Sequence, residues 1–162
     1  MRMLQRICLG VLFFLGCQVI SAQKTGEQDI KTFLEQSAGA GTFKIDVTMA
    51  YPMRGRSVPL TGNYSLELKN DSADVYLPYY GRAYNVPYGG GKGLVFKVPV
   101  EDYRSESRKG KYNMVTFSTS NEEDSFDFVI RLYENGRANI SVMMRNRSSI
   151  SYSGMLDATG LQ

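Results

Sequence analysis

The side chains that could do chemistry in this sequence are carboxylates beside turns and tyrosines around one arginine. Two groups of acids lie close together along the chain, Asp71/Asp74 and Glu122/Glu123/Asp124. Two carboxylates about 5 to 10 Å apart can hydrolyse a glycosidic bond. Both groups have polar neighbours at predicted turns, where acids commonly accept backbone hydrogen bonds. They also lack the alternating acid spacing of an EF-hand calcium loop. We therefore interpret them as turn residues.

Composition excludes several other kinds of site. The 162 residues contain no histidine and no tryptophan, and the two cysteines are Cys8 and Cys17. Without histidine or later cysteines, the body of the chain has no Ser-His-Asp triad, Cys-His dyad, thiolate zinc site or disulfide. The run Gly89-Gly90-Gly91-Lys92-Gly93 lacks the Ser or Thr and the earlier glycine of a phosphate-binding loop. We expect no cofactor and no metal.

One segment departs from the background, because five of the eleven tyrosines lie between Tyr76 and Tyr88. A tyrosine ring offers an apolar face and a hydroxyl, which suits a sugar ring or a peptide strand. Arg82 could hold a carboxylate or phosphate through two parallel hydrogen bonds. We predict a ligand-binding loop formed by Tyr79, Tyr80, Arg82, Tyr84 and Tyr88, with at least two of its tyrosines exposed. The alternative is that these rings plug one end of a barrel.

The first 22 residues have the pattern of an export signal. Two arginines precede an apolar run from Ile7 to Leu15, which is too short to cross a membrane as a helix, and Ser21-Ala22 follows. We predict cleavage after Ala22 and a periplasmic or secreted protein. In the alternative, Phe14-Leu15-Gly16-Cys17 is a lipobox, and a lipid on Cys17 anchors the protein at the outer membrane.

Removal of this segment changes the charge. Without Arg2 and Arg6, 17 basic residues of the original 19 face 16 acidic ones, so the mature chain is close to neutral. A near-neutral chain lacks the basic surface that nucleic acids require. We therefore expect no nucleic-acid partner, and membrane contact only if Cys17 is lipidated.

The remaining chain predicts one β domain. Residues 23–42 form a polar lead-in and a short helix at 28–37, because Ile30, Phe33 and Leu34 have helical spacing and glycines follow. Alternating apolar residues within 43–157 then predict about eight strands joined by short connections. With only one helix, these strands form an antiparallel meander that curls into a barrel or a sandwich. The charged stretch 103–111 is predicted to be a solvated loop.

The alternation also predicts strand register. A turn at Asn70-Asp71 places Leu66 opposite Val75. At Asn135-Gly136, a two-residue turn would put even residues opposite odd ones. A three-residue loop, 134–136, instead places the apolar residues of 126–132 and 138–144 on one face, which outweighs the usual preference for a two-residue Asn-Gly turn. Gly136 then needs a positive φ.

Five stretches together resemble one family: Tyr64-Ser-Leu, Tyr76-Leu-Pro-Tyr-Tyr-Gly-Arg-Ala-Tyr, Pro87-Tyr-Gly-Gly-Gly, Asn135-Gly-Arg-Ala and Arg147-Ser-Ser-Ile-Ser-Tyr-Ser-Gly. The chain is similar over residues 43–155 to domain-of-unknown-function family number 4251, exported proteins and predicted lipoproteins chiefly from Bacteroidetes. The resemblance implies an exported bacterial protein and carries no activity, substrate or catalytic residue.

Two functions fit these observations. The first is a non-catalytic binding or structural module of the cell envelope that uses the tyrosine loop, with a glycan or a peptide as its partner. The second is a small envelope hydrolase that uses surface carboxylates with Arg82. We favour the first, because the chain has no histidine, no usable cysteine and no acid within the tyrosine segment.

Overall fold

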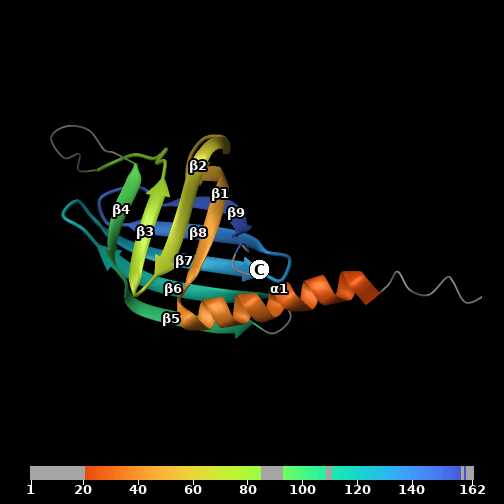
Figure 1. Ribbon diagram of the computed structural model, residues 1–162. Helices are drawn as coiled ribbons and strands as arrows, with labels where there is room; N and C mark the ends of the chain where they lie inside the picture. The colour runs from red at the N-terminus through yellow and green to blue at the C-terminus, as the bar shows by residue number, and fades with distance from the viewer. Residues whose placement is uncertain (1–20, 85–92, 109–110, 158, 160–162) are drawn as a thin grey trace, which may run out of the picture.

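The computed structural model describes residues 21–84, 93–108, 111–157 and 159, with residues 21–29 described by their backbone alone. One helix and nine strands lie within these residues (Figure 1). In chain order they are α1 (Ser21–Ala40), β1 (Phe43–Pro52), β2 (Val58–Lys69), β3 (Ser72–Leu77), β4 (Leu94–Pro99), β5 (Glu101–Arg108), β6 (Tyr112–Ser120), β7 (Ser125–Tyr133), β8 (Arg137–Met144) and β9 (Ile150–Leu156).

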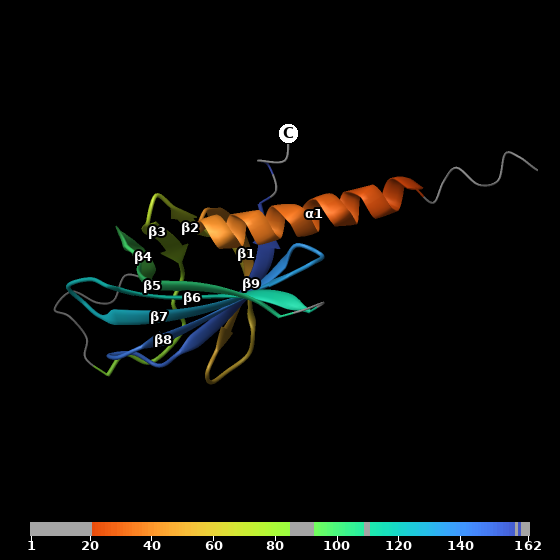
Figure 2. The ribbon, with the colours of Figure 1, turned by 90° about the horizontal axis from the view of Figure 1, so that it is seen from below.

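The nine strands form one antiparallel sheet in the order β4-β3-β2-β1-β9-β8-β7-β6-β5. Two runs of consecutive hairpins therefore meet where β1 pairs with β9. The edge strands β4 and β5 stand at opposite ends of this order, yet only Val100 separates them in the sequence. The sheet must curl until its two edges approach each other, and it forms a nearly closed barrel (Figures 1 and 2). The predicted mainly-β fold with one N-terminal helix is confirmed.

Inward-facing residues of all strands except β5 fill the barrel. The Phe117 and Phe128 rings stack with centroids 4.7 Å apart, and Phe96 of β4 contacts Phe126 of β7 at 4.6 Å. This second contact joins an edge strand to the wall that faces it. Each buried aromatic or branched side chain contributes about 1.5–3 kcal/mol through removal from water, so the interior supplies most of the fold's stability.

The C-terminal half of α1 packs against the sheet. Leu34 and Ala38 are buried, and the Tyr103 hydroxyl of β5 donates a hydrogen bond to the Ala38 carbonyl. Burial raises the pKa of Tyr103 to about 12, so the donor stays protonated at neutral pH. Within the described ranges, no helix combines the length and apolar character needed to cross a membrane.

Helix α1 is longer than predicted, because residues 23–28 are helical rather than an irregular lead-in. Its N-terminal part extends beyond the barrel (Figure 2). The apolar spacing that predicted the helix comes from Ile30, Phe33 and Leu34, in the part that packs against the sheet. Alanine, glutamine, lysine and glutamate, which are common in residues 22–28, have high helix propensity and favour the longer helix.

The prediction of a loop at 103–111 is wrong, because most of it belongs to β5. This strand has one neighbour, β6, and the register of the pair shifts between Glu101 and Arg104. Of its eight residues only Tyr103 is half-buried, and the others are exposed. An edge strand of this kind is commonly charged, which discourages pairing with another chain, and it shows no apolar alternation.

Both register predictions are confirmed. In the β7–β8 hairpin, Leu132 pairs with Ala138, Ile130 with Ile140 and Phe128 with Val142. In the β2–β3 hairpin, Leu66 pairs with Val75.

The two turns differ in length. Asn70 and Asp71 alone connect β2 and β3, and both have positive φ, 52° and 55°. The β7–β8 loop spans 134–136, and its Gly136 has φ 78°. Both backbones suit the right-handed twist of the flanking strands.

We predict that Gly136→Ala lowers the free energy of unfolding by about 1 kcal/mol, because an alanine is strained at positive φ. A Cβ there would meet only the Met155 Cε, at 3.6 Å, so backbone strain accounts for the cost. Urea denaturation measures it. Gly39→Ala is the matched control: Gly39 lies in α1 with nothing within 4 Å of its Cβ position, so stability should rise by up to about 1 kcal/mol. Equal stability of Gly136→Ala and the wild type would contradict the strain.

Candidate functional site

The candidate site lies where the chain leaves β3 and runs beside the connection between β8 and β9. Ala83 forms an isolated antiparallel bridge with Arg147. The Tyr84 amide donates to the Asn146 carbonyl at 2.8 Å, and the Ser148 amide donates to the Arg82 carbonyl at 2.9 Å. The tyrosine segment, residues 78–84, is therefore held by a short backbone ladder.

Tyr79 points into this ladder. Its hydroxyl lies 2.8 Å from the Ser148 carbonyl oxygen, 3.0 Å from the Ser148 Oγ and 3.1 Å from the Arg82 carbonyl oxygen. The Arg82 amide in turn donates to the Ser148 Oγ at 3.1 Å. A Cβ on Gly81 would lie 2.1 Å from the Tyr79 hydroxyl, so only glycine permits this close approach. Tyr79 is thus an anchor of the segment.

A second tyrosine holds the segment where it leaves β3. The buried Tyr152 of β9 donates its hydroxyl to the Pro78 carbonyl at 2.8 Å. Burial, assisted by Tyr79 and Tyr80, raises the pKa of Tyr152, so the phenol remains a donor across the physiological range. Of the tyrosines in the segment, Tyr79 fits the alternative that these rings plug one end of the barrel, and Tyr152 of β9 adds a further ring at that end.

Beneath Tyr79 lies a buried arginine, Arg147, which pairs with the exposed Glu123 and the buried Asp124. The Arg147 guanidinium is 5.7 Å from the centre of the Tyr79 ring, and its side chain is 5% exposed. Arg147 Nη2 lies 2.6 Å from Glu123 Oε2, and its Nε lies 3.8 Å from Asp124 Oδ2. Guanidinium-ring and guanidinium-carboxylate contacts are strong where water is excluded. These contacts fix the β8–β9 connection on which the tyrosine segment rests.

Asp124 shows how the acids of the β6–β7 turn are used. Its carboxylate is fully buried and accepts hydrogen bonds from the backbone amides of Ser125, Arg145 and Asn146. This confirms the interpretation of Asp124 as a turn residue.

The other acidic group is only partly at a turn, because Asp74 lies within β3 and not in the turn before it. Asp71 lies within the β2–β3 turn, and Asp74 lies 3.6 Å from Lys97 on the exposed face. Within the described ranges, no three His, Cys, Asp or Glu residues are placed to hold a metal ion.

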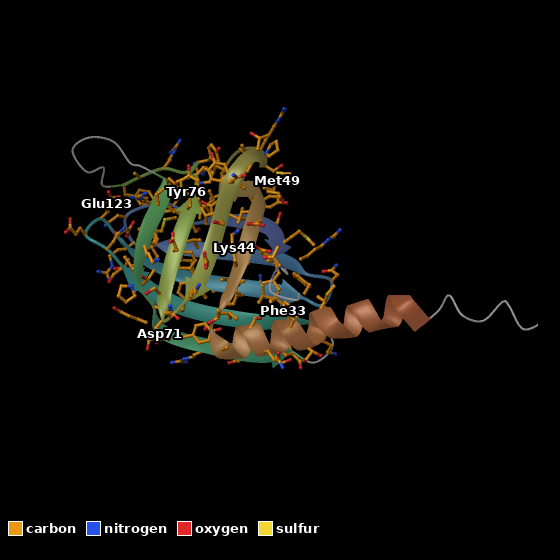
Figure 3. The ribbon with its side chains drawn as sticks, viewed as in Figure 1. Phe33, Lys44, Met49, Asp71, Tyr76 and Glu123 are labelled. Atoms are coloured by element: carbon orange, nitrogen blue, oxygen red, sulfur yellow. The ribbon has the colours of Figure 1, made fainter. Side chains whose placement is uncertain are left out.

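The outer side of the tyrosine segment borders a cavity of about 500 Å³. Tyr80, Arg82 and Tyr84 all line it. Tyr80 is 42% and Tyr84 69% exposed, so two tyrosines are exposed beside Arg82, as predicted. Tyr88 lies outside the described residues. In Figure 3 this end of the barrel is at the top, on the side of the labelled Tyr76 of β3, whereas Phe33 and Asp71 lie at the opposite end.

The opposite wall of the cavity comes from the β1–β2 connection, through Met53, Arg54 and Gly55. Sequence reasoning missed these residues. Residues 53–57 look like an ordinary polar loop, and nothing in them indicates that they reach the tyrosine segment. The antiparallel order of β1, β2 and β3 places both connections at the same end of the barrel, where they border one cavity. The described lining contains two guanidinium groups and no carboxylate, so it can take an anionic or acceptor-rich ligand.

The chain resembles known proteins in both sequence and fold. The model of the DUF4251 family, a domain of unknown function, matches residues 22–156, so the chain belongs to that family. The chain is similar to a DUF4251 family protein from Bacteroides eggerthii whose crystal structure is known. The two are 18% identical with a TM-score of 0.62, over 82% of this chain and 87% of the other. That likeness supports the fold. A search of functionally curated proteins produced no match.

We predict that Tyr79→Phe loosens the segment without unfolding the protein. The carbonyls of Arg82 and Ser148 lose a hydrogen-bond donor, which should cost about 1–2 kcal/mol. Amide hydrogen exchange should accelerate at Tyr84 and Ser148, whose N–H groups form the ladder.

The matched control is Tyr133→Phe. The Tyr133 hydroxyl accepts only a long, exposed contact of 3.4 Å from Asn139. Its loss should change stability by less than about 0.5 kcal/mol and leave exchange in the ladder unchanged. Identical exchange in the two variants would show that Tyr79 is not an anchor.

Proposed function

We propose that this DUF4251 protein is a non-catalytic binding module of the bacterial cell envelope, with a glycan or a peptide as its ligand. One observation carries the proposal: the side chains of Tyr80, Arg82 and Tyr84 face one cavity, while the backbone that bears them is pinned by the Tyr79 and Ser148 hydrogen bonds. A surface that is ordered before the ligand arrives loses less conformational entropy on binding.

The hydrolase alternative has less support. Asp124 uses its carboxylate to accept three backbone amides, and Glu123 pairs with Arg147. No acid is among the described residues that line the cavity beside Arg82. A glycosidase needs two carboxylates across its substrate, so the geometry favours binding.

Location in the envelope rests on the N-terminal sequence. The basic, apolar and small-residue pattern of residues 1–22 is typical of an export signal. The family match begins at residue 22, next to the proposed cleavage point. Cleavage after Ala22 would leave nearly all of α1 in the mature chain.

We predict that Tyr80→Ala/Tyr84→Ala abolishes capture of the envelope partner and lowers the melting temperature by only a few degrees. Both rings are exposed, so their removal costs little packing, whereas each would stack on the ligand. Pull-down of peptidoglycan and a glycan array measure capture, and calorimetry measures the melting temperature.

The control is Tyr112→Ala/Tyr133→Ala, which removes two half-buried rings whose centres are 5.8 Å apart. These two residues pair with each other where β6 begins and β7 ends, at the end of the barrel away from the tyrosine segment. It should cost more stability than Tyr80→Ala/Tyr84→Ala and still capture the partner. If Tyr80→Ala/Tyr84→Ala unfolds, the two rings serve the fold and the proposal fails.

We predict that the protein from its native host begins at Gln23, because Ser21-Ala22 ends the signal and Phe14 occupies the first lipobox position, where leucine is preferred. Intact mass spectrometry reads the mature N-terminus directly. A diacylglycerol adduct on Cys17 would contradict release and place the protein on a membrane.

A further inference from the structure

The cavity beside the tyrosine segment differs in charge from three others on the molecule. In each of those three, a lining lysine is paired with a lining acid. The pairs are Lys31 with Glu134 at 2.9 Å, Lys44 with Asp157 at 3.4 Å and Lys97 with Asp74 at 3.6 Å. Beside the tyrosine segment, by contrast, no described carboxylate lies within 4 Å of Arg54 or Arg82.

The two arginines come from separate parts of the chain. Arg82 belongs to the pinned tyrosine segment. Its backbone amide donates a hydrogen bond to the Ser148 Oγ, and its carbonyl accepts one from the Ser148 amide. Arg54 belongs to the β1–β2 connection across the cavity. The fold therefore brings two guanidinium groups to one hollow without a described acid to neutralise them. Such an arrangement is stabilised when a ligand supplies the anions.

The polar groups of the lining are unbalanced as well. Each guanidinium has five N–H donors and no acceptor, and the hydroxyl of Ser148 is occupied by Tyr79 and the Arg82 amide. The remaining described polar side chains are the phenols of Tyr80 and Tyr84. A neutral sugar can accept hydrogen bonds from these donors, but it brings no negative charge to neutralise the two guanidinium groups. A ligand rich in carboxylate oxygens suits it well.

We propose that this cavity binds an acidic glycan. The carboxylates of uronic or related acidic sugars pair with Arg54 and Arg82, and the sugar rings lie against Tyr80 and Tyr84. The volume of about 500 Å³ is within the range of small-ligand sites, about 300–1,000 Å³. This inference rests on the proposed function and narrows its ligand to one chemical class.

Two other anionic partners fit the same groups less well. Single-stranded nucleic acid also stacks on aromatic rings, but it requires a continuous basic groove, and the chain after residue 22 has 17 basic and 16 acidic residues. A peptide is normally held by buried apolar anchors, and Met53 is the sole aliphatic side chain among the described lining residues.

The test is titration calorimetry of the purified protein with three acidic glycans: oligogalacturonate, alginate oligomers and hyaluronan oligomers. Each is compared with its methyl ester, which keeps the sugar ring and removes the charge. Polyglutamate and oligothymidylate represent the acidic-peptide and nucleic-acid alternatives. We expect at least one acidic glycan to bind and its methyl ester to bind at least about tenfold more weakly, as for loss of a charged hydrogen bond.

Three single substitutions locate the site. Arg54→Gln and Arg82→Gln should each weaken binding of the acidic glycan about tenfold. Arg137→Gln is the matched control, because Arg137 is also exposed but begins β8 at the opposite end of the barrel. The affinity of this variant for the acidic glycan should equal that of the wild type. Binding should also weaken as salt is added, because the contacts are ionic.

The inference is overturned if no acidic glycan binds, if a methyl ester binds as tightly as its parent acid, or if polyglutamate or oligothymidylate binds as tightly as the best glycan. Equal loss in the Arg137→Gln control would overturn the location. In any of these cases the capture experiment judges the proposed binding function separately. If capture of envelope material depends on Tyr80 and Tyr84, the proposed function stands without the acidic-glycan inference. If no such capture occurs, the proposed function and the inference both fail.

Discussion

The single residue between β4 and β5 is the constraint on which the barrel depends. Because these strands form opposite edges of one sheet and one residue joins them, the sheet has to curl until its two edges meet at that residue. Hydrogen bonds hold the chain on both sides of the bend between β4 and β5. The Val100 amide donates to the Asp71 carbonyl at 2.8 Å, and the buried Thr119 hydroxyl donates to the Pro99 carbonyl at 2.9 Å. The antiparallel strand order places the connections after β1, β3 and β8 at the same end of this barrel, where they border one cavity.

The two halves of the sheet approach each other closely where β1 pairs with β9. Gly154 pairs with Val47, and a Cβ on Gly154 would lie 2.1 Å from the Asp46 carbonyl oxygen. The β1 register also shifts between Val47 and Met49 against both of its neighbours. A bulge bends a strand and increases its twist. Beyond this bulge Pro52 pairs with Ile150, so the β1–β2 connection, with Arg54, starts beside the β8–β9 connection, which pairs with the tyrosine segment.

The sequence predicted those parts of the structure in which burial imposes a pattern. Strands 125–133 and 137–144, their register and the positive φ of Gly136 follow from apolar residues at every second position. Strand β5 could not be predicted in this way, because its edge position demands no apolar alternation. The tyrosine segment was recognised by composition, but the inward role of Tyr79 and the outward role of Tyr80 depend on Ser148 and Arg147, which are distant in sequence.

Arginine has two distinct uses at this end of the barrel, and the difference explains how a rigid site can remain available. Arg147 is withdrawn from water with Glu123 and Asp124 around it, and loss of one buried partner leaves an uncompensated charge. That cost holds the β8–β9 connection in one geometry. Arg82 has its backbone fixed by the same connection, yet its guanidinium stays in solvent. Glu123 and Asp124 are thus committed to Arg147, and no described carboxylate lies within 4 Å of Arg82, which is the state that the proposed anionic ligand requires.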